Sequence, residues 1–228
     1  MIHDNILDLK RRVNSVCSSV SVEPCNITIV AVSKNRSVDE IRQVIEAGIN
    51  DIGENRVQEA LLKYRILKNI TSIRWHMVGH LQTNKVKDAV EIFDLIHSVD
   101  SLHLAEEINR RAERINKIQR VLIEVKTSPE LTKFGIEPGK LHEFIKELVK
   151  FKNLEVKGLM TIAPSFAEAE KTRPFFRILR ELKEVFNQER ELPFKLEILS
   201  MGMSNDFEIA LQEGANMLRI GRAIFEGE

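Results

Sequence analysis

Lys34 is the residue whose position points most directly to chemistry. It follows the apolar run 27–33 (ITIVAVS), which is rich in Ile and Val, as a strand buried on both faces should be. A lysine at the end of such a strand is partly shielded from water. It then gives up its proton more readily and can attack an aldehyde as the neutral amine. The plainer interpretation is a solvated lysine that caps the strand.

Two clusters near the end of the chain combine glycine with hydrogen-bond donors. The first is the run 200–204 (SMGMS), with Ser200 and Ser204, and the second is Gly221 followed by Arg222. Glycine lets backbone N–H groups come close to an anion, and hydroxyl and guanidinium groups add further donors. Each glycine alone is more often a turn, but the two clusters together predict an anion site.

Arg219 and His76 each allow two interpretations. Arg219 lies within the apolar run 217–220, where a charge is costly unless it is paired or faces a site. A salt bridge to a strand-end acid such as Glu54 is the alternative. His76 and His80 are four residues apart, which on a helix could indicate a metal pair. Because Gly79 interrupts a predicted strand here, we expect no metal, and His76 to be a site-wall or core histidine.

Eight short apolar runs, each followed by an amphipathic or polar segment, predict eight strand-then-helix units. The predicted strands are 27–33, 51–53, 73–78, 95–98, 120–125, 156–160, 196–199 and 217–220. The segments between them include predicted helices at 38–47, 83–90, 102–116, 138–151, 166–189 and 206–212, and one more helix precedes the first strand. Strict alternation implies a parallel sheet. Eight units in 228 residues favour one closed (β/α)8 barrel domain, 1–228, over an open doubly wound sheet.

In such a barrel the site lies at the carboxyl ends of the strands. The polar or glycine residues at these ends are Ser33, Lys34, Glu54, Asn55, His76, Gly79, His80, Ser98, Thr161, Ser200, Gly202, Ser204, Gly221 and Arg222, with Met160 beside Thr161 and Arg219 inside the last strand. Strand periodicity alone has no reason to gather so many functional side chains at one face.

Composition narrows the class of protein. Lys+Arg and Asp+Glu are both 34, so the formal net charge is zero, which argues against nucleic-acid and acidic-membrane partners. Cys17 and Cys25 fit neither a metal pattern nor a disulfide framework, and we expect free thiols in a reducing cytoplasm. The N-terminal residues do not form a secretory signal, and no run is apolar enough for a membrane span.

The same residues carry a family resemblance that runs nearly end to end. The matching segments are AVSK (31–34), DIGENRVQEA (51–60), WHMVGHLQTNK (75–85), GLMTIAP (158–164) and LSMGMSNDFEIALQEGANMLRIGRAIFEG (199–227). With these segments the chain resembles the pyridoxal phosphate homeostasis protein family. One segment departs from the family pattern: 124–135 reads EVKTSPELTKFG, where relatives carry a Gly/Ser/Glu-containing stretch before Lys-x-Gly.

The resemblance implies an α/β fold, the (β/α)8 barrel of the alanine-racemase N-terminal type, and pyridoxal 5'-phosphate (PLP) held as an aldimine of Lys34. It implies that Arg219 faces the pyridine nitrogen, which would keep that nitrogen unprotonated and the ring a weak electron sink. Ser200, Gly221 and Arg222 would surround the phosphate together with Ser204. Asn55, His76 and Met160 would line the cofactor.

Two functions of different class remain open, with a vestigial structural barrel as a third. The first is a non-catalytic PLP carrier, a cytoplasmic monomer that serves PLP-dependent apoenzymes. The second is an amino-acid racemase, which needs two opposed acid/base groups at the substrate carbon. The sequence has one tyrosine, Tyr64, and we expect it to pack on a helix rather than to serve as the second base. We therefore expect binding without turnover.

Overall fold

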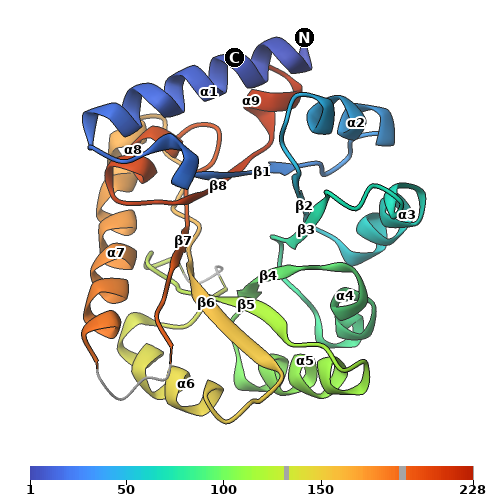
Figure 1. Cartoon of the computed structure of the whole chain (residues 1–228). Helices are drawn as coiled ribbons and strands as arrows, with labels where there is room; N and C mark the ends of the chain where they lie inside the picture. Colours follow the sequence, from blue (N-terminus) through green and yellow to red (C-terminus); the bar gives the residue numbers. More distant parts are fainter. Residues whose placement is uncertain (131–133, 190–193, 228) are drawn as a thin grey trace.

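The eight parallel strands close into a barrel in the order of the sequence, and helices surround it (Figure 1). The computed structural model describes residues 1–130, 134–189 and 194–227. The strands are β1 (Thr28–Val32), β2 (Asp51–Glu54), β3 (Arg74–Met77), β4 (Leu95–Val99), β5 (Gln119–Glu124), β6 (Leu154–Met160), β7 (Ile198–Ser200) and β8 (Met217–Ile220). Pairing of β1 with β8, Thr28 opposite Met217, closes the ring. The predicted (β/α)8 barrel with one preceding helix is confirmed.

The helices follow the strands on the outside. They are α1 (Ile2–Ser19), α2 (Val38–Glu46), α3 (Val57–Leu67), α4 (Val86–Ile92), α5 (Leu102–Arg114), α6 (Leu141–Leu148), α7 (Arg173–Gln188), α8 (Phe207–Gln212) and α9 (Arg222–Phe225). Short 3-10 turns are η1 (Pro24–Asn26), η2 (Thr83–Lys85), η3 (Pro138–Lys140) and η4 (Ala169–Thr172). None of the helices in the described ranges combines the length and apolarity that crossing a membrane requires.

The helix predicted over 166–189 starts later than its apolar pattern suggested. α7 begins at Arg173, and Pro174 lies in its first turn. Proline fits the first turn because its missing N–H has no partner there. Before α7 come the 3-10 turn η4 (Ala169–Thr172) and a loop that includes Ser165 and Phe166, and this loop lines the cavity described below.

Helix α1 covers the outside of the barrel beside α8 and α9 (Figure 1). Its buried side chains, Ile2, Ile6, Leu9, Val13 and Cys17, recur every three or four residues and form one apolar stripe. Burying such side chains stabilises the fold by roughly 1.5–3 kcal/mol each. Cys17 is a free, buried thiol and Cys25 a free, exposed one.

The inside of the barrel is filled by side chains rather than open. An apolar cluster of Val30, Val78, Leu95, Leu122, Met160 and Met217 occupies it. Polar side chains are also buried within the barrel strands, among them His76, His97, Ser200 and Arg219. Buried polar groups require hydrogen-bond partners, and the hydrogen bonds of these four side chains connect the barrel interior to the cavity described next.

Candidate functional site

A cavity of about 730 Å³ opens at the carboxyl ends of several barrel strands, where a site was predicted. Its walls come from the segments that follow β1, β2, β3, β6, β7 and β8. They are formed by Val32, Lys34, Asn35, Arg36, Asn55, Val78, Gly79, Ile162, Pro164, Ser165, Phe166, Ala169, Thr172, Met203, Ser204, Asn205, Asp206, Arg219, Gly221, Arg222, Phe225 and Glu226. Six of the nine predicted cofactor-binding residues lie in this cavity: Lys34, Asn55, Ser204, Arg219, Gly221 and Arg222.

The other three predicted residues lie elsewhere. His76, Met160 and Ser200 do not line the cavity and are buried in the barrel. Met160 belongs to the apolar cluster inside the barrel. His76 and Ser200 instead join the hydrogen-bonded chain described below, which ends at Arg219.

Lys34 stands on a tight turn at the end of β1. The Arg36 N–H donates to the carbonyl of Ser33 over 3.0 Å, and Asn35 has a positive φ of 60°, a conformation that asparagine tolerates better than most residues. Lys34 itself is exposed. The expected shielding of this lysine is therefore not provided by the described residues.

A buried cluster of charged side chains forms hydrogen bonds with the backbone of this turn. The Lys63 ammonium donates to the Ser33 carbonyl at 2.6 Å, to Glu54 Oε1 at 2.6 Å and to Glu59 Oε1 at 2.7 Å. Ser33 Oγ also donates to Glu54 Oε1, and the Asn35 N–H donates to Glu59 Oε1 at 2.6 Å. Burial raises the pKa of Glu54, although the hydrogen bonds from Lys63 and Ser33 oppose the shift. Lys63, which lies in the middle of α3, was not predicted from the sequence.

Ser204 and Arg222 form the wall of the cavity at the start of α9. The hydroxyl of Ser204 accepts a hydrogen bond from the Ala223 N–H at 3.1 Å, and Arg222 donates to the side chain of Asn205 at 3.0 Å. The hydroxyl of Ser204 and the guanidinium of Arg222 can both donate to an anion in the cavity.

Position 202 requires glycine because of its backbone conformation and its close neighbours. Its φ is +92°, and a Cβ there would lie 2.6 Å from the Cβ of Ala210. Gly202 thus fixes the path of the chain into Met203 and Ser204. Gly221, in contrast, has ordinary space around it.

Arg219 is a buried cation held by neutral acceptors. Its guanidinium donates to the Ser200 carbonyl at 2.7 Å, to Ser200 Oγ at 2.8 Å and to the Thr161 carbonyl at 2.8 Å. The alternative salt bridge to Glu54 is wrong, because Glu54 pairs with Lys63. Burial lowers the pKa of Arg219 to about 10, so it stays charged at neutral pH. Its Nε–H bonds to no residue in the described part of the chain, so an acceptor in the cavity can use it.

A chain of hydrogen bonds crosses the barrel from Arg219 to the far end of β2. Ser200 Oγ lies 3.0 Å from His97 Nδ1, His97 Nε2 lies 3.0 Å from His76 Nδ1, and His76 Nε2 lies 3.0 Å from Asp51 Oδ1. Burial lowers the pKa of His97 well below its usual range. One arrangement of donors satisfies every contact, each group donating to the next from Arg219 to Asp51. The chain fixes the position of Ser200 and therefore of Arg219.

Asp51 anchors this chain at the other end of the barrel. Burial acts to raise the pKa of Asp51, but hydrogen bonds from His76 and Arg74 outweigh it and hold that pKa below its usual value. Arg74 Nε donates to Asp51 Oδ1 at 2.7 Å. His97 was not among the predicted residues, although it lies in the middle of the apolar run 95–98, where a polar residue signals an unusual environment.

Two buried carboxyl groups near Arg219 were also missed. Burial raises the pKa of Glu124, the last residue of β5, to about 7. Burial likewise raises the pKa of Asp206, which accepts a hydrogen bond from the Met203 N–H at 2.6 Å. The signal for Glu124 was an acid at the end of an apolar strand, the same signal that singled out Lys34.

His80 and Tyr64 are accounted for by local contacts. His80 lies 3.4 Å from Asp100, so it and His76 point to different partners. Among the described residues, no group of three or more potential ligands gathers where it could hold a metal ion. Tyr64 packs edge-on against Trp75, with ring centroids 6.1 Å apart, as expected for a packing residue. In the divergent segment 124–135, Thr132 and Lys133 lie outside the described residues.

Comparison with known proteins places the chain in a family. The family model described as "Alanine racemase, N-terminal domain" matches residues 8–228. A relative from Aquifex aeolicus, named pyridoxal phosphate homeostasis protein, is 43% identical over 214 residues, covering 94% of this chain and 92% of that protein.

Two solved structures of PipY from Synechococcus elongatus PCC7942 are similar throughout. The structure without PLP has a TM-score of 0.88 at 36% identity, and the structure with PLP bound has 0.84 at 35%. Each comparison covers 99% of this chain and 100% of PipY. The chain therefore belongs to the pyridoxal phosphate homeostasis protein family, within the alanine-racemase N-terminal fold.

Proposed function

We propose that this protein binds PLP covalently through the amine of Lys34 and serves in PLP homeostasis as a carrier without catalytic turnover. The observation that carries the proposal is the convergence of three features in one cavity. An exposed lysine, an anion-binding wall of Ser204 and Arg222, and a buried cation at Arg219 match an aldehyde, a phosphate and a ring nitrogen. Relatives named for PLP homeostasis and PipY with PLP bound support the same assignment.

The charges of the cavity fit an anionic ligand. Its basic residues are Lys34, Arg36, Arg219 and Arg222, and its acidic ones are Asp206 and Glu226. Arg36 is neutralised by an ion pair with Glu226. Lys34, Arg219 and Arg222 then outweigh Asp206, so the cavity favours a phosphate.

Each of these residues would have a separate task. Lys34 would supply the amine that joins the aldehyde, and Ser204 and Arg222 would bind the phosphate. Arg219 would donate to the ring nitrogen from its fixed position, and Asn55 would line the side of the ring. When bound, PLP supplies a reactive aldehyde and an electron-withdrawing ring.

The second candidate, an amino-acid racemase, lacks an opposed base of the expected kind. No tyrosine lines the cavity within the described ranges, and Tyr64 packs against Trp75. We propose further that the whole chain acts as one PLP-binding domain and as a monomer that passes PLP to apoenzymes. Light scattering coupled to size exclusion tests the monomer, and a single-enantiomer amino-acid assay tests turnover. Robust racemisation by the pure protein would overturn the carrier proposal.

The decisive experiment is an absorption titration with PLP, followed by borohydride reduction and peptide mass spectrometry. We expect a visible band in the wild type and reductive labelling of the peptide that contains Lys34. Lys34→Ala should lose both, while Lys68→Ala, an exposed lysine at the end of α3, should keep both. Labelling elsewhere, or none, contradicts the proposal.

A comparison of PLP with pyridoxal, which lacks the phosphate, tests the anion-binding wall separately. The wild type should prefer PLP, and Arg222→Ala with Ser204→Ala should lose about tenfold or more of that preference, because charge-assisted hydrogen bonds contribute roughly 1.5–3 kcal/mol each. Equal preference in wild type and variant would remove Ser204 and Arg222 from the phosphate site.

A further inference from the structure

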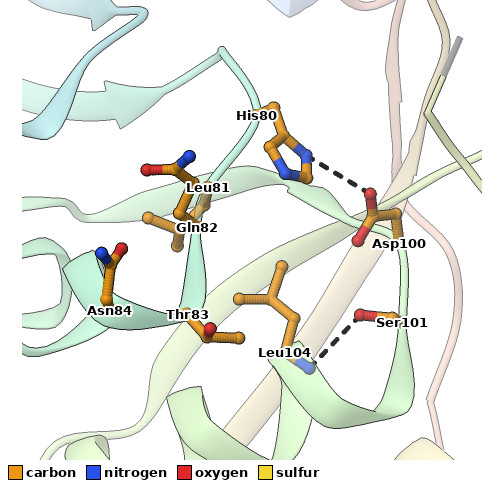
Figure 2. A pocket seen from close by; sticks show the side chains of 8 residues that line it. All are labelled: His80, Leu81, Gln82, Thr83, Asn84, Asp100, Ser101 and Leu104. Atoms are coloured by element: carbon orange, nitrogen blue, oxygen red, sulfur yellow. Dashed lines mark hydrogen bonds and ion pairs between the residues drawn. The ribbon is translucent and has the colours of Figure 1, made fainter. Parts of the chain in front are cut away.

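A second pocket of about 500 Å³ lies beside the proposed cofactor cavity, between the segments that follow β3 and β4 (Figure 2). It is lined by His80, Leu81, Gln82, Thr83, Asn84, Asp100, Ser101 and Leu104. Gly79 lines the cofactor cavity and the next residue, His80, lines the second pocket. Gly79 also packs on Asn55, since a Cβ there would lie 2.5 Å from the Asn55 carbonyl oxygen. The two cavities are therefore neighbours at the same end of the barrel.

Two amide side chains of this pocket are not used by the fold. Leu81 and Leu104 are buried and supply the packing. Gln82 and Asn84 are exposed, and their amides form no hydrogen bond within the described ranges of the chain. In Figure 2 they lie on the opposite side of Leu104 from Asp100. These amides are available to a ligand.

The charge of the pocket selects the kind of ligand. Asp100 is the one carboxylate in its lining, its side chain only 11% exposed, and no lysine or arginine is among the described lining residues. Such a wall disfavours phosphate or carboxylate and favours a cation that can donate hydrogen bonds. Burial raises the pKa of Asp100, and the facing groups are His80 and the carboxyl of Glu124, whose own pKa is raised in part by Asp100. A bound ammonium would stabilise the ionised form of Asp100.

His80 forms a fixed edge of the pocket. Its Nδ1 lies 3.4 Å from Asp100, and its ring stacks on Phe134 with centroids 3.8 Å apart and planes 13° apart. Phe134 and Glu124 line a third, smaller cavity, where Lys126 is the nearest basic residue. The imidazole is thus held by two contacts before any ligand arrives.

We propose that the pocket of His80, Gln82, Asn84 and Asp100 binds the primary ammonium group of an amine that takes PLP from Lys34. The ammonium would donate to Asp100, and the amides, on the other side of Leu104, would bind polar atoms farther along the ligand. The inference rests on the proposed function for the transfer itself. In that transfer the amine leaves Asp100 for the neighbouring cofactor cavity, where its nitrogen forms the double bond to the carbon held by Lys34 as the double bond between that carbon and Lys34 breaks. The three protons of the incoming ammonium pass to the Lys34 nitrogen, which leaves as an ammonium. Nothing is oxidised or reduced.

The amine could belong to a small free amine or to a lysine side chain of a recipient protein. Binding is measured on the full chain without cofactor, by calorimetry and by the NMR shift of the His80 ring. The probes are L-alaninamide, which has an ammonium and no carboxylate, and the peptide acetyl-Gly-Lys-Gly-amide, with the Nε-acetyllysine peptide as the matched control. We expect one amine probe to bind with a shift of His80, and the acetylated peptide not to bind.

Asp100→Asn keeps the shape of the side chain and removes its charge, and should weaken amine binding at least about tenfold. Gln82→Leu, at an exposed position, should weaken it a few-fold. Asp88→Asn, on α4 and outside the pocket, should leave binding unchanged. Unchanged binding in Asp100→Asn, or equal binding of the acetylated peptide, overturns the proposal.

The rate of PLP release from loaded protein gives an independent readout. With increasing amine, release should saturate in the wild type and rise linearly in Asp100→Asn, because only a bound amine saturates. A linear rise in both overturns the pocket and leaves Lys34 binding intact. Failure of PLP to load on Lys34 would instead overturn the proposed function, while the calorimetry without cofactor still decides the pocket.

Discussion

Replacing Lys63 by methionine should destabilise the protein by removing the cation beneath the Lys34 turn. Glu59 is 23% exposed in its side chain and can be rehydrated, but Glu54 is fully buried and its Oε2 already has no partner among the described residues. Glu54 will therefore take up a proton rather than stay charged. Holding a carboxyl with an ordinary pKa of 4.5 protonated at pH 7 costs about 3 kcal/mol. For a chain of this size that corresponds to a fall in Tm of roughly 6–12 °C.

The assay is thermal and urea unfolding of cofactor-free protein at pH 5 and pH 7. Because the cost is that of protonating Glu54, it should shrink to below about 1 kcal/mol at pH 5. Adding Glu54→Gln to Lys63→Met should recover most of the loss at pH 7, and Lys68→Met, at an exposed lysine that caps the C-terminal end of the same helix, should change stability by less than about 0.5 kcal/mol. A loss that is the same at both pH values, or that Glu54→Gln does not reduce, would refute this reasoning.

Three further predictions concern the barrel interior and one turn. His97→Leu should cost about 2–4 kcal/mol in urea unfolding, since the buried Ser200 hydroxyl and the buried His76 ring each lose one hydrogen-bond partner. A loss under about 1 kcal/mol would speak against the hydrogen-bonded chain. Glu124 has a pKa of about 7 in the folded protein, above its ordinary 4.5, so the folded state holds its proton more tightly than the unfolded state. The stability of the wild type should therefore fall by up to about 3 kcal/mol between pH 4.5 and pH 7, relative to that of Glu124→Gln. Parallel pH profiles of the two proteins would contradict this. Gly202→Ala should lower stability by about 2 kcal/mol or more and weaken PLP binding, because of its φ of +92° and the contact with Ala210. Gly139→Ala, with open space around it, is the control, and equal losses in the two would exclude strain as the cause.

The barrel and much of the cavity could be predicted because both depend on order along the chain. Apolar runs alternating with amphipathic segments specify a parallel barrel, and a barrel brings the strand ends together whatever the intervening helices do. Lys34, Asn55 and Arg222 follow from this rule alone. Ser200 also lies at a strand end, yet its side chain turns into the barrel to bond Arg219 and His97.

The residues that were not predicted from the sequence bond to side chains and backbone groups of other strands and helices. Lys63 lies in the middle of α3 and looks like any helical lysine, but its ammonium reaches under the adjacent strand ends to Ser33 and Glu54. From the sequence, His97 is an ordinary strand residue. Its place in the hydrogen-bonded chain depends on Ser200, which is 103 positions away in the sequence. Such partners are set by packing between elements, which no local pattern reports.

The way Arg219 is held bears on what the cavity can do. The guanidinium of Arg219 donates to two backbone carbonyls and a hydroxyl and, among the residues that the structure describes, to no carboxylate. The hydrogen-bonded chain through His97 reaches a carboxylate only at Asp51, after the two imidazoles. The guanidinium therefore keeps its full positive charge, with a lowered pKa that still leaves it ionised at neutral pH. Under the proposed binding mode, that charge beside the ring nitrogen disfavours its protonation, and an unprotonated ring withdraws electrons weakly. A site built in this way suits holding PLP on Lys34 better than breaking bonds at a substrate carbon, which links the buried chain of hydrogen bonds to the carrier role.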